Sequence, residues 1–113
     1  MNHFLEKLLF VCSRNRQRSL TAERIFESEP GYQVRSAGTA PGARTKLTPG
    51  LLGWADIVFV MERKHRDWIL AHYADLVTGK PIVTLLIPDE YGYMDDELVD
   101  ILTNRVAAYL AGD

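Results

Sequence analysis

The feature that most constrains the fold is an alternation of short apolar runs with longer segments of helical periodicity. Four runs have the length and composition of β-strands, at 7–11, 32–36, 57–61 and 82–87. Four segments between and after them carry apolar residues at helical spacing. Because strands that alternate with helices are joined by crossovers, the sequence predicts a doubly wound α/β sandwich, with a four-stranded parallel sheet flanked by helices.

Prolines, glycines and capping residues indicate the ends of the helices. Pro30 and Gly31 end the first helical segment. Thr48 followed by a proline predicts the start of a short helix, because threonine caps a first turn and proline fits the first helical position. Glu62 opens the third helix, and Asp95 is expected to cap the last one.

The four strands are expected to differ in position. The run at 57–61 is continuously apolar, which is typical of a strand covered on both faces and predicts a central place in the sheet. The run at 32–36 alternates apolar and polar residues, so it is expected near an edge. Ligands of such sheets bind beyond the carboxyl ends of the strands, which directs attention to the residues after 7–11 and 82–87.

Composition limits the class of protein. The 113 residues match one ordinary domain, spanning 1–113, and the 47% hydrophobic and 25% charged residues are typical of a globular protein. No apolar run approaches the roughly 18 residues that cross a membrane. The first residues lack the pattern of a secretory signal, so we expect a cytoplasmic protein with no membrane partner. The net charge of -2 gives no case for nucleic acid as a partner.

The segment from Cys12 to Ser19 leaves the first apolar run and enters a helical pattern. In a strand, loop and helix of this order, N–H groups of the loop and of the first helical turn are unpaired and can converge on one anion. The segment holds the only cysteine, and it carries arginines at alternate positions, Arg14, Arg16 and Arg18. These observations predict a phosphate-binding loop with a cationic mouth.

Cys12 has two interpretations. A free cysteine at the end of a strand is most often buried packing, whereas a thiolate beside a cation and a helix N-terminus is a nucleophile. Arg18 favours the second, because a guanidinium stabilises a thiolate and can grip two phosphate oxygens. Ser19 can donate a hydrogen bond to the thiolate, although an N-cap is its other possible role. Asn15 suits a left-handed backbone within the loop.

Several short motifs extend this pattern along the chain: Phe10-Val11-Cys12, Asn15, Arg18-Ser19, Ala22-Glu23, Ser36-Ala37-Gly38-Thr39, Asp56-Ile57-Val58 with Met61, and Asp89-Glu90-Tyr91-Gly92. Together and in this order they resemble the low-molecular-weight protein tyrosine phosphatase family. The last motif resembles the loop of that family that carries the acid.

The resemblance implies a role for each matching residue. Cys12 is implied as the nucleophile, Arg18 as the phosphate clamp, Asp89 as the general acid, Ser19 as the partner of the thiolate and Asn15 as support for the loop. The implied reaction transfers the phosphoryl group to Cys12 while Asp89 protonates the leaving oxygen, and water then hydrolyses the phosphocysteine. Neither a metal nor a cofactor is implied.

The expected partner is a phosphorylated protein, above all one with phosphotyrosine, or a small aryl phosphate ester. Inorganic phosphate or another oxyanion is expected to bind in the same loop. The residues expected to contact these ligands are Ser13, Arg14, Asn15, Arg16, Gln17, Ser19 and Tyr91. Tyr91 and Tyr93 either wall an aromatic leaving group or lie on the surface.

The chain departs from the family pattern at several places. Arg14 stands where the family usually has glycine, Gln17 where it often has a second cysteine, and Glu90 where it has proline. The chain is also shorter between Thr39 and Asp56. We expect these differences to affect the choice of substrate more than the chemistry.

Two other functions remain open. Arsenate reductases share this loop, but they need further cysteines, so only an external thiol would allow that reaction here. A module that binds phosphorylated partners without turnover is the other alternative.

The acid also has alternatives to Asp89 nearby in the sequence. These are Glu90, Asp95 and Asp96, although helix capping explains the last two.

The remaining ring side chains are interpreted as structural. His65 and His72 share one face of a predicted helix without a third metal ligand at suitable spacing, so we interpret them as helix surface or partial packing. Trp54 and Trp68 are interpreted as core residues.

Overall fold

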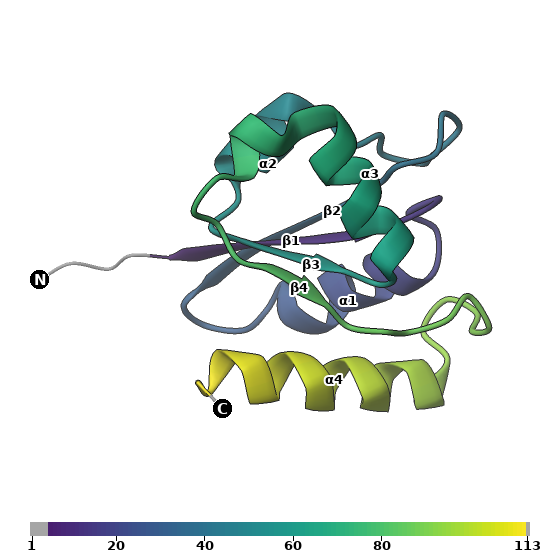
Figure 1. Ribbon diagram of the computed structural model, residues 1–113. Coiled ribbons are helices and arrows are strands. Elements are labelled where there is room, and N and C mark those ends of the chain that lie inside the picture. The colour runs from purple at the N-terminus through teal and green to yellow at the C-terminus, as the bar shows by residue number, and fades with distance from the viewer. Residues whose placement is uncertain (1–4, 113) are drawn as a thin grey trace, which may run out of the picture.

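Strands and helices alternate along residues 5–112, the part of the chain that the computed structural model describes (Figure 1). The elements are β1 (Glu6–Cys12), α1 (Arg18–Phe26), β2 (Tyr32–Gly38), α2 (Pro49–Trp54), β3 (Ile57–Val60), α3 (Arg63–Tyr73), the 3-10 helix η1 (Ala74–Val77), β4 (Ile82–Thr84) and α4 (Asp96–Leu110).

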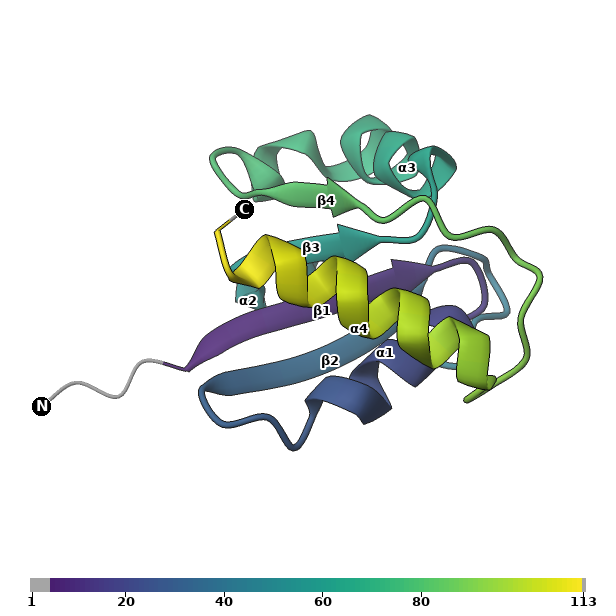
Figure 2. The ribbon, with the colours of Figure 1, turned by 90° about the horizontal axis from the view of Figure 1, so that it is seen from below.

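The strands form one sheet in the order β2-β1-β3-β4, and every neighbouring pair is parallel (Figure 2). The predicted α/β class with a four-stranded parallel sheet is therefore confirmed. β2 lies at an edge and β3 lies inside the sheet, as the alternation at 32–36 and the continuous apolar run at 57–61 indicated.

Helices cover both faces of the sheet (Figure 1). α1 and α4 pack on one face, where Phe10 and Phe59 stack with ring centroids 5.0 Å apart. α2, α3 and η1 cover the other face, over a buried cluster that includes Val11, Val58 and Ile69. Burial of apolar surface on both faces explains why β1 and β3 are almost continuously apolar.

The capping residues lie where the sequence indicated. Thr48 caps α2 by accepting a hydrogen bond from the Leu51 N–H, and Asp95 caps α4 by accepting from the N–H groups of Glu97 and Leu98. α1 ends at Phe26, a few residues before the proline expected to stop it.

The predicted fourth strand is too long. β4 ends at Thr84 instead of continuing to Ile87, because Leu86 adopts a left-handed backbone with φ 58°. Hydrogen bonds to the end of β3 continue beyond this point, from Leu85 N–H to Val60 O and from Ile87 N–H to Met61 O. The segment after β4 therefore stays attached to the sheet while it turns toward the loop that carries Asp89.

The tryptophans are only half-buried, so their interpretation as core residues was wrong in part. The Arg35 guanidinium lies 4.4 Å from the ring centroid of Trp54, and the Lys46 ammonium lies 4.7 Å from that of Trp68. Cations therefore cover the exposed sides of both rings.

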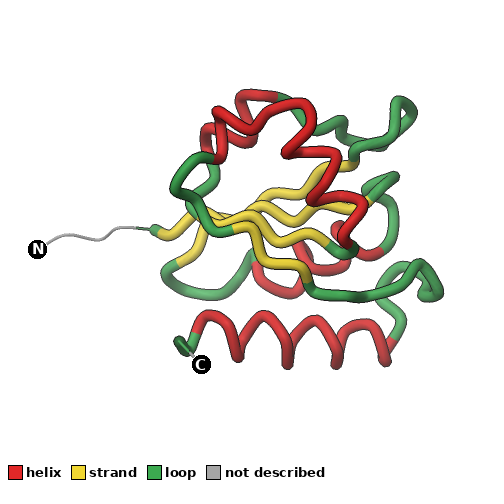
Figure 3. The backbone as a smooth tube through the Cα atoms, viewed as in Figure 1, coloured by secondary structure: helices red, strands yellow, loops and turns green. Residues whose placement is uncertain are grey.

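Loops after β1, β2 and β4 gather at the carboxyl ends of the strands, on the side of the sheet away from the C-terminus (Figure 3). This arrangement follows from the parallel topology, in which equivalent strand ends meet at one edge. Within residues 5–112, no helix combines the length and apolar character required to cross a membrane.

Candidate active site

The loop between β1 and α1 depends on a left-handed residue. Cys12 is the last residue of β1, and Arg18 is the first residue of α1. Asn15 lies between them with φ 57° and is fully buried. This conformation, which asparagine tolerates better than most residues, reverses the chain direction within a few residues.

The segment after β2 supports the loop from outside. The Ala40 N–H donates to Ser13 O at 2.9 Å, and Arg44 donates its backbone N–H to Arg14 O and its Nε to Asn15 O. Gly38 makes this contact possible, because a Cβ built there would lie 2.4 Å from Ser13 O. The loop is therefore fixed by backbone contacts and by one close approach that excludes a side chain.

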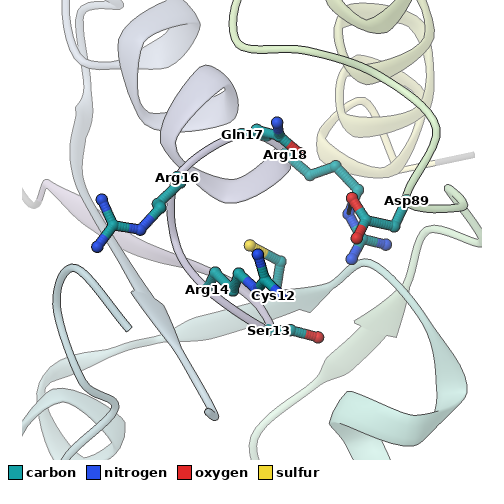
Figure 4. Close-up of a pocket in the computed structure, with 7 residues that line it drawn as sticks. All are labelled: Cys12, Ser13, Arg14, Arg16, Gln17, Arg18 and Asp89. Carbon is teal, nitrogen blue, oxygen red and sulfur yellow. Dashed lines mark ion pairs between the residues drawn. The ribbon is translucent and has the colours of Figure 1, made fainter. Parts of the chain in front are cut away.

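An anion-sized cavity opens over this loop (Figure 4). Its volume is about 80 Å³, and its walls are Cys12, Ser13, Arg14, Arg16, Gln17, Arg18 and Asp89. Within the described chain, the backbone N–H groups of Arg14, Arg16 and Gln17 make no hydrogen bond to protein. Unpaired donors beside a helix N-terminus are groups that can bind an anion, and the phosphate-binding role of this loop stays a prediction.

The Cys12 sulfur lies in a chain of hydrogen bonds. Asn15 Nδ2 donates to Ser19 Oγ at 2.8 Å, and Ser19 Oγ lies 2.9 Å from Cys12 Sγ. The Asn15 N–H also points at the sulfur, at 3.3 Å. When the sulfur is a thiolate it accepts from both groups, and when it is a thiol the serine proton can turn toward Ala37 O, 3.4 Å away. Both protonation states of Cys12 are thereby accommodated.

Ser19 lies inside α1 and does not cap it, since the residue at the N-cap is Gln17. Ser19 is fully buried, and its hydroxyl faces the sulfur. Its alternative interpretation as a helix cap was therefore wrong. Neither Ser19 nor Asn15 lines the cavity, so both support the loop from beneath.

Arg18 is held rigidly although it is charged. Its side chain is only 2% exposed, and its Nη1 donates to Glu62 Oε2 and to Ile87 O. Its Nε lies 3.8 Å from Asp89 Oδ1. A buried guanidinium with fixed partners is preorganised to bind phosphate oxygens, because little side-chain freedom is lost when the ligand arrives.

Glu62, the residue at the N-cap of α3, anchors this arginine and was missing from the predicted site. Partial burial raises the pKa of Glu62, but the hydrogen bond from Arg18 and the positive charge of Arg18 outweigh it and lower the pKa below the usual value. Glu62 is therefore a carboxylate at neutral pH. The position of Glu62 in the sequence indicated this role, because Glu62 follows the end of β3 by two residues and so lies at the same edge of the sheet as Cys12.

His65 is buried, at 1% exposure, so its interpretation as helix surface or partial packing was wrong. Its Nδ1 accepts a hydrogen bond from the Glu62 N–H, and its Nε2 lies 2.9 Å from Ser13 Oγ. A neutral ring with an accepting Nδ1 carries its proton on Nε2, so Nε2 donates to the serine. Burial, and then the positive charge of Arg18, lowers the pKa of His65 from 6.5 to about 4.

Asp89 occupies the opposite wall of the cavity, and its side chain is 60% exposed. Asp89 is the one carboxylate among the described residues that line the cavity. The rival acids do not line it: these are Glu90, Asp95 and Asp96. Asp95 instead caps α4. Tyr91 also lies outside the cavity wall, and its hydroxyl donates to Glu97. The structure therefore brings together the predicted residues of the loop and Asp89, but it does not bring Tyr91 to them.

No group of three His, Cys, Asp or Glu side chains within the described residues is arranged to hold a metal ion.

Comparisons of sequence find no matching family model and no similar curated protein. Comparisons of structure find close neighbours. The tyrosine phosphatase Wzb from Escherichia coli K30, solved with phosphate, superposes with a TM-score of 0.75 at 21% identity and covers 94% of this chain and 96% of its own. The tyrosine phosphatase AmsI from Erwinia amylovora reaches a TM-score of 0.76 at 20% identity, over 96% and 93%.

A third neighbour is a YwlE arginine phosphatase variant whose active-site serine, introduced in place of cysteine, is phosphorylated. It has a TM-score of 0.72 at 24% identity and covers 95% of this chain and 97% of its own. The chain has the fold of these phosphatases. The fold expected from the low-molecular-weight phosphatase motifs is thereby confirmed across nearly the whole length of this chain and of each of the three neighbours.

Proposed function

We propose that this protein is a cysteine-dependent phosphatase that hydrolyses phosphotyrosine or small aryl phosphate esters through a phosphocysteine intermediate. One observation carries the proposal. The sulfur of Cys12 lies at the floor of an anion-sized cavity, with Ser19 beneath it, Arg18 at its side and Asp89 on the opposite wall. The known activities of neighbours with this fold support the same reaction class.

The proposed reaction has two displacement steps. The phosphate oxygens bind to the loop N–H groups and to Arg18, and the Cys12 thiolate attacks phosphorus as the bond to the leaving oxygen breaks. Protonated Asp89 donates its proton to that oxygen. Asp89 then removes a proton from water, which attacks phosphocysteine, releases phosphate and returns the thiolate to its hydrogen bonds with Ser19 and Asn15.

The charges around the cavity favour an aryl ester over phosphoarginine, which is the substrate that the name of one neighbour indicates for that protein. Arg14 and Arg16 line the cavity together with Arg18. A phosphoarginine substrate would bring a further guanidinium-derived group against these cations, whereas an aryl ester would not. Arsenate reduction is not favoured, because Cys12 is the only cysteine of the chain.

The test is hydrolysis of para-nitrophenyl phosphate and of a phosphotyrosine peptide by the wild type and by Cys12→Ser. We expect the substitution to reduce turnover by about 10⁴-fold or more, since the nucleophile is lost. The Cys12→Ser protein should still bind inorganic phosphate, measured by calorimetry. Turnover that persists in Cys12→Ser would contradict the mechanism. Tight binding of phosphopeptide by the wild type without release of phosphate would instead identify a binding module.

A further inference from the structure

The guanidinium groups around the cavity differ in how they are neutralised. Arg18 is buried and lies against the carboxylates of Glu62 and Asp89. Arg14 and Arg16 line the same cavity but are exposed, and among residues 5–112 neither has a carboxylate within 4.0 Å. Two positive charges at the mouth of the site are therefore without a protein counter-charge.

These charges are not spread evenly around the cavity. In Figure 4, Arg16 lies on the side opposite Asp89 with its guanidinium directed outward, and Arg14 lies between them, beside Cys12. Arg44 adds a third exposed cation to this side, since its Nε donates to Asn15 O in the loop. The other side carries Asp89 and the exposed Glu90. The mouth is thus basic on one flank and acidic on the other.

A phosphate group alone does not use the basic flank. Its oxygens are matched by Arg18 and by the unpaired N–H groups of the loop. The cavity of about 80 Å³ has room for little more than that group, so the rest of a substrate lies outside, over the mouth. The protein carries a net charge of -2, so the three exposed arginines are not part of a generally basic surface. They form a local basic patch beside the cavity.

We propose that the preferred substrate is a phosphorylated peptide segment with acidic residues on one side of the phosphorylated residue, held by Arg14 and Arg16. This inference rests on the proposed function and names its substrate class. An extended peptide advances about 3.3–3.6 Å per residue, so residues beside the phosphorylated one lie over the rim of the mouth, within reach of the outward-directed Arg16. On the opposite flank, Glu90 repels acidic residues, so the preference depends on which side of the phosphate the acidic residues lie.

The experiment measures binding of phosphotyrosine peptides to Cys12→Ser by calorimetry, so that it does not depend on turnover. Four peptides differ only in the residues beside the phosphotyrosine: Glu residues before it, Glu residues after it, Gln on both sides, and Lys on both sides. We expect one of the two acidic peptides to bind about five- to tenfold more tightly than the Gln peptide at low salt. The Lys peptide should bind most weakly, and 0.5 M salt should reduce these differences.

Charge-removing variants in the same background locate the effect. Arg16→Gln should reduce the preference for the acidic peptide, and Arg14→Gln combined with it should bring the ratio of affinities close to one. Lys7→Gln is the matched control, because it removes one positive charge from β1 at the opposite end of the strand from the loop. It should leave the ratio unchanged.

The outcomes separate this inference from the proposed function. Equal affinities for the acidic and Gln peptides would overturn the inference, as would a preference that survives loss of both arginines, and wild-type turnover of the same peptides would still support a phosphatase. A preference that depends on Arg14 and Arg16 would support the inference even if no peptide is hydrolysed. Failure of Cys12→Ser to bind any phosphopeptide would overturn the inference, and wild-type turnover of para-nitrophenyl phosphate would then decide the proposed function separately.

Discussion

The two walls of the cavity are built in opposite ways. The loop from Cys12 to Arg18 is enclosed by hydrogen bonds and by close contact with Gly38, and its key side chains are almost fully buried. Asp89 lies on an exposed loop, and its contact with the rest of the site is an ion pair at 3.8 Å. The fold therefore sets the geometry of the proposed phosphate site, whereas the side chain that would deliver the proton is free to adjust to the leaving oxygen.

Among changes outside the loop from Cys12 to Arg18, Asp89→Asn should give the largest loss of turnover. We expect turnover of an ester with a poor leaving group to fall about 10³-fold, because the leaving oxygen loses its proton donor. Stability should change by less than about 0.5 kcal/mol, since the side chain is exposed. Rates with para-nitrophenyl and phenyl phosphate provide the measurement, and the loss should be smaller for the better leaving group. Glu90→Gln is the control. An equal loss of turnover in that variant would contradict the assignment of Asp89 as the proton donor.

Gly38→Ala should damage both binding and stability. The added Cβ would lie 2.4 Å from Ser13 O, so the loop or β2 must move. We expect a loss of about 1–3 kcal/mol in the free energy of unfolding and a drop of about 100-fold in turnover. Gly42→Ala is a matched control, because a Cβ there meets nothing within 4 Å. Urea unfolding and phosphatase assays on both variants test this, and equal effects would show that the loop does not need the close approach.

His65 should make the free energy of unfolding of the protein depend on pH. Its pKa is lowered to about 4 in the folded chain, whereas an unfolded chain has a histidine pKa near 6.5. Between these values the unfolded chain binds the proton and the folded chain does not, so stability falls as the pH is lowered from about 6.5 to 4. The full loss approaches about 3 kcal/mol. His65→Gln should lose this part of the pH dependence in urea unfolding, and an unchanged profile would contradict a neutral buried ring.

Glu62→Gln should have a smaller effect that phosphate partly reverses. The variant leaves the buried Arg18 without its closest counter-charge, so we expect a loss of about 1–2 kcal/mol in stability. A bound phosphate supplies the missing negative charge. Inorganic phosphate should therefore raise the melting temperature of Glu62→Gln more than that of the wild type. An equal increase in both proteins would show that Glu62 and phosphate do not share Arg18.

The contiguous half of the site could be read from the sequence, because the loop residues follow one another between a strand and a helix. Cys12, Asn15 and Ser19 form one hydrogen-bonded network, Arg18 follows at the start of α1, and the spacing of these residues in the chain carries the signal. The resemblance implied Asp89 as the general acid. The rule that the carboxyl ends of parallel strands meet at one edge of the sheet predicted that it lies near Cys12.

Other parts of the site required the structure. Glu62 and His65 lie after β3, and their contacts with the loop depend on how α3 is oriented on the sheet. Spacing alone could not distinguish a buried histidine from one on the helix surface. The early end of β4 was also hidden, because nothing in the apolar run at 82–87 indicates that Leu86 takes a left-handed backbone.

The hydrogen bond from Arg18 to Ile87 O joins residues 69 positions apart. A contact between residues so far apart carries a large loop-closure entropy, and it cannot form before Ile87 has been synthesised. During synthesis, the cysteine would therefore emerge long before the segment that orients its arginine and carries its acid. A site whose arginine is anchored, and whose proposed acid arrives, only after β4 has docked would be switched on by completion of folding itself, so turnover would report the fully folded chain and no partly folded precursor.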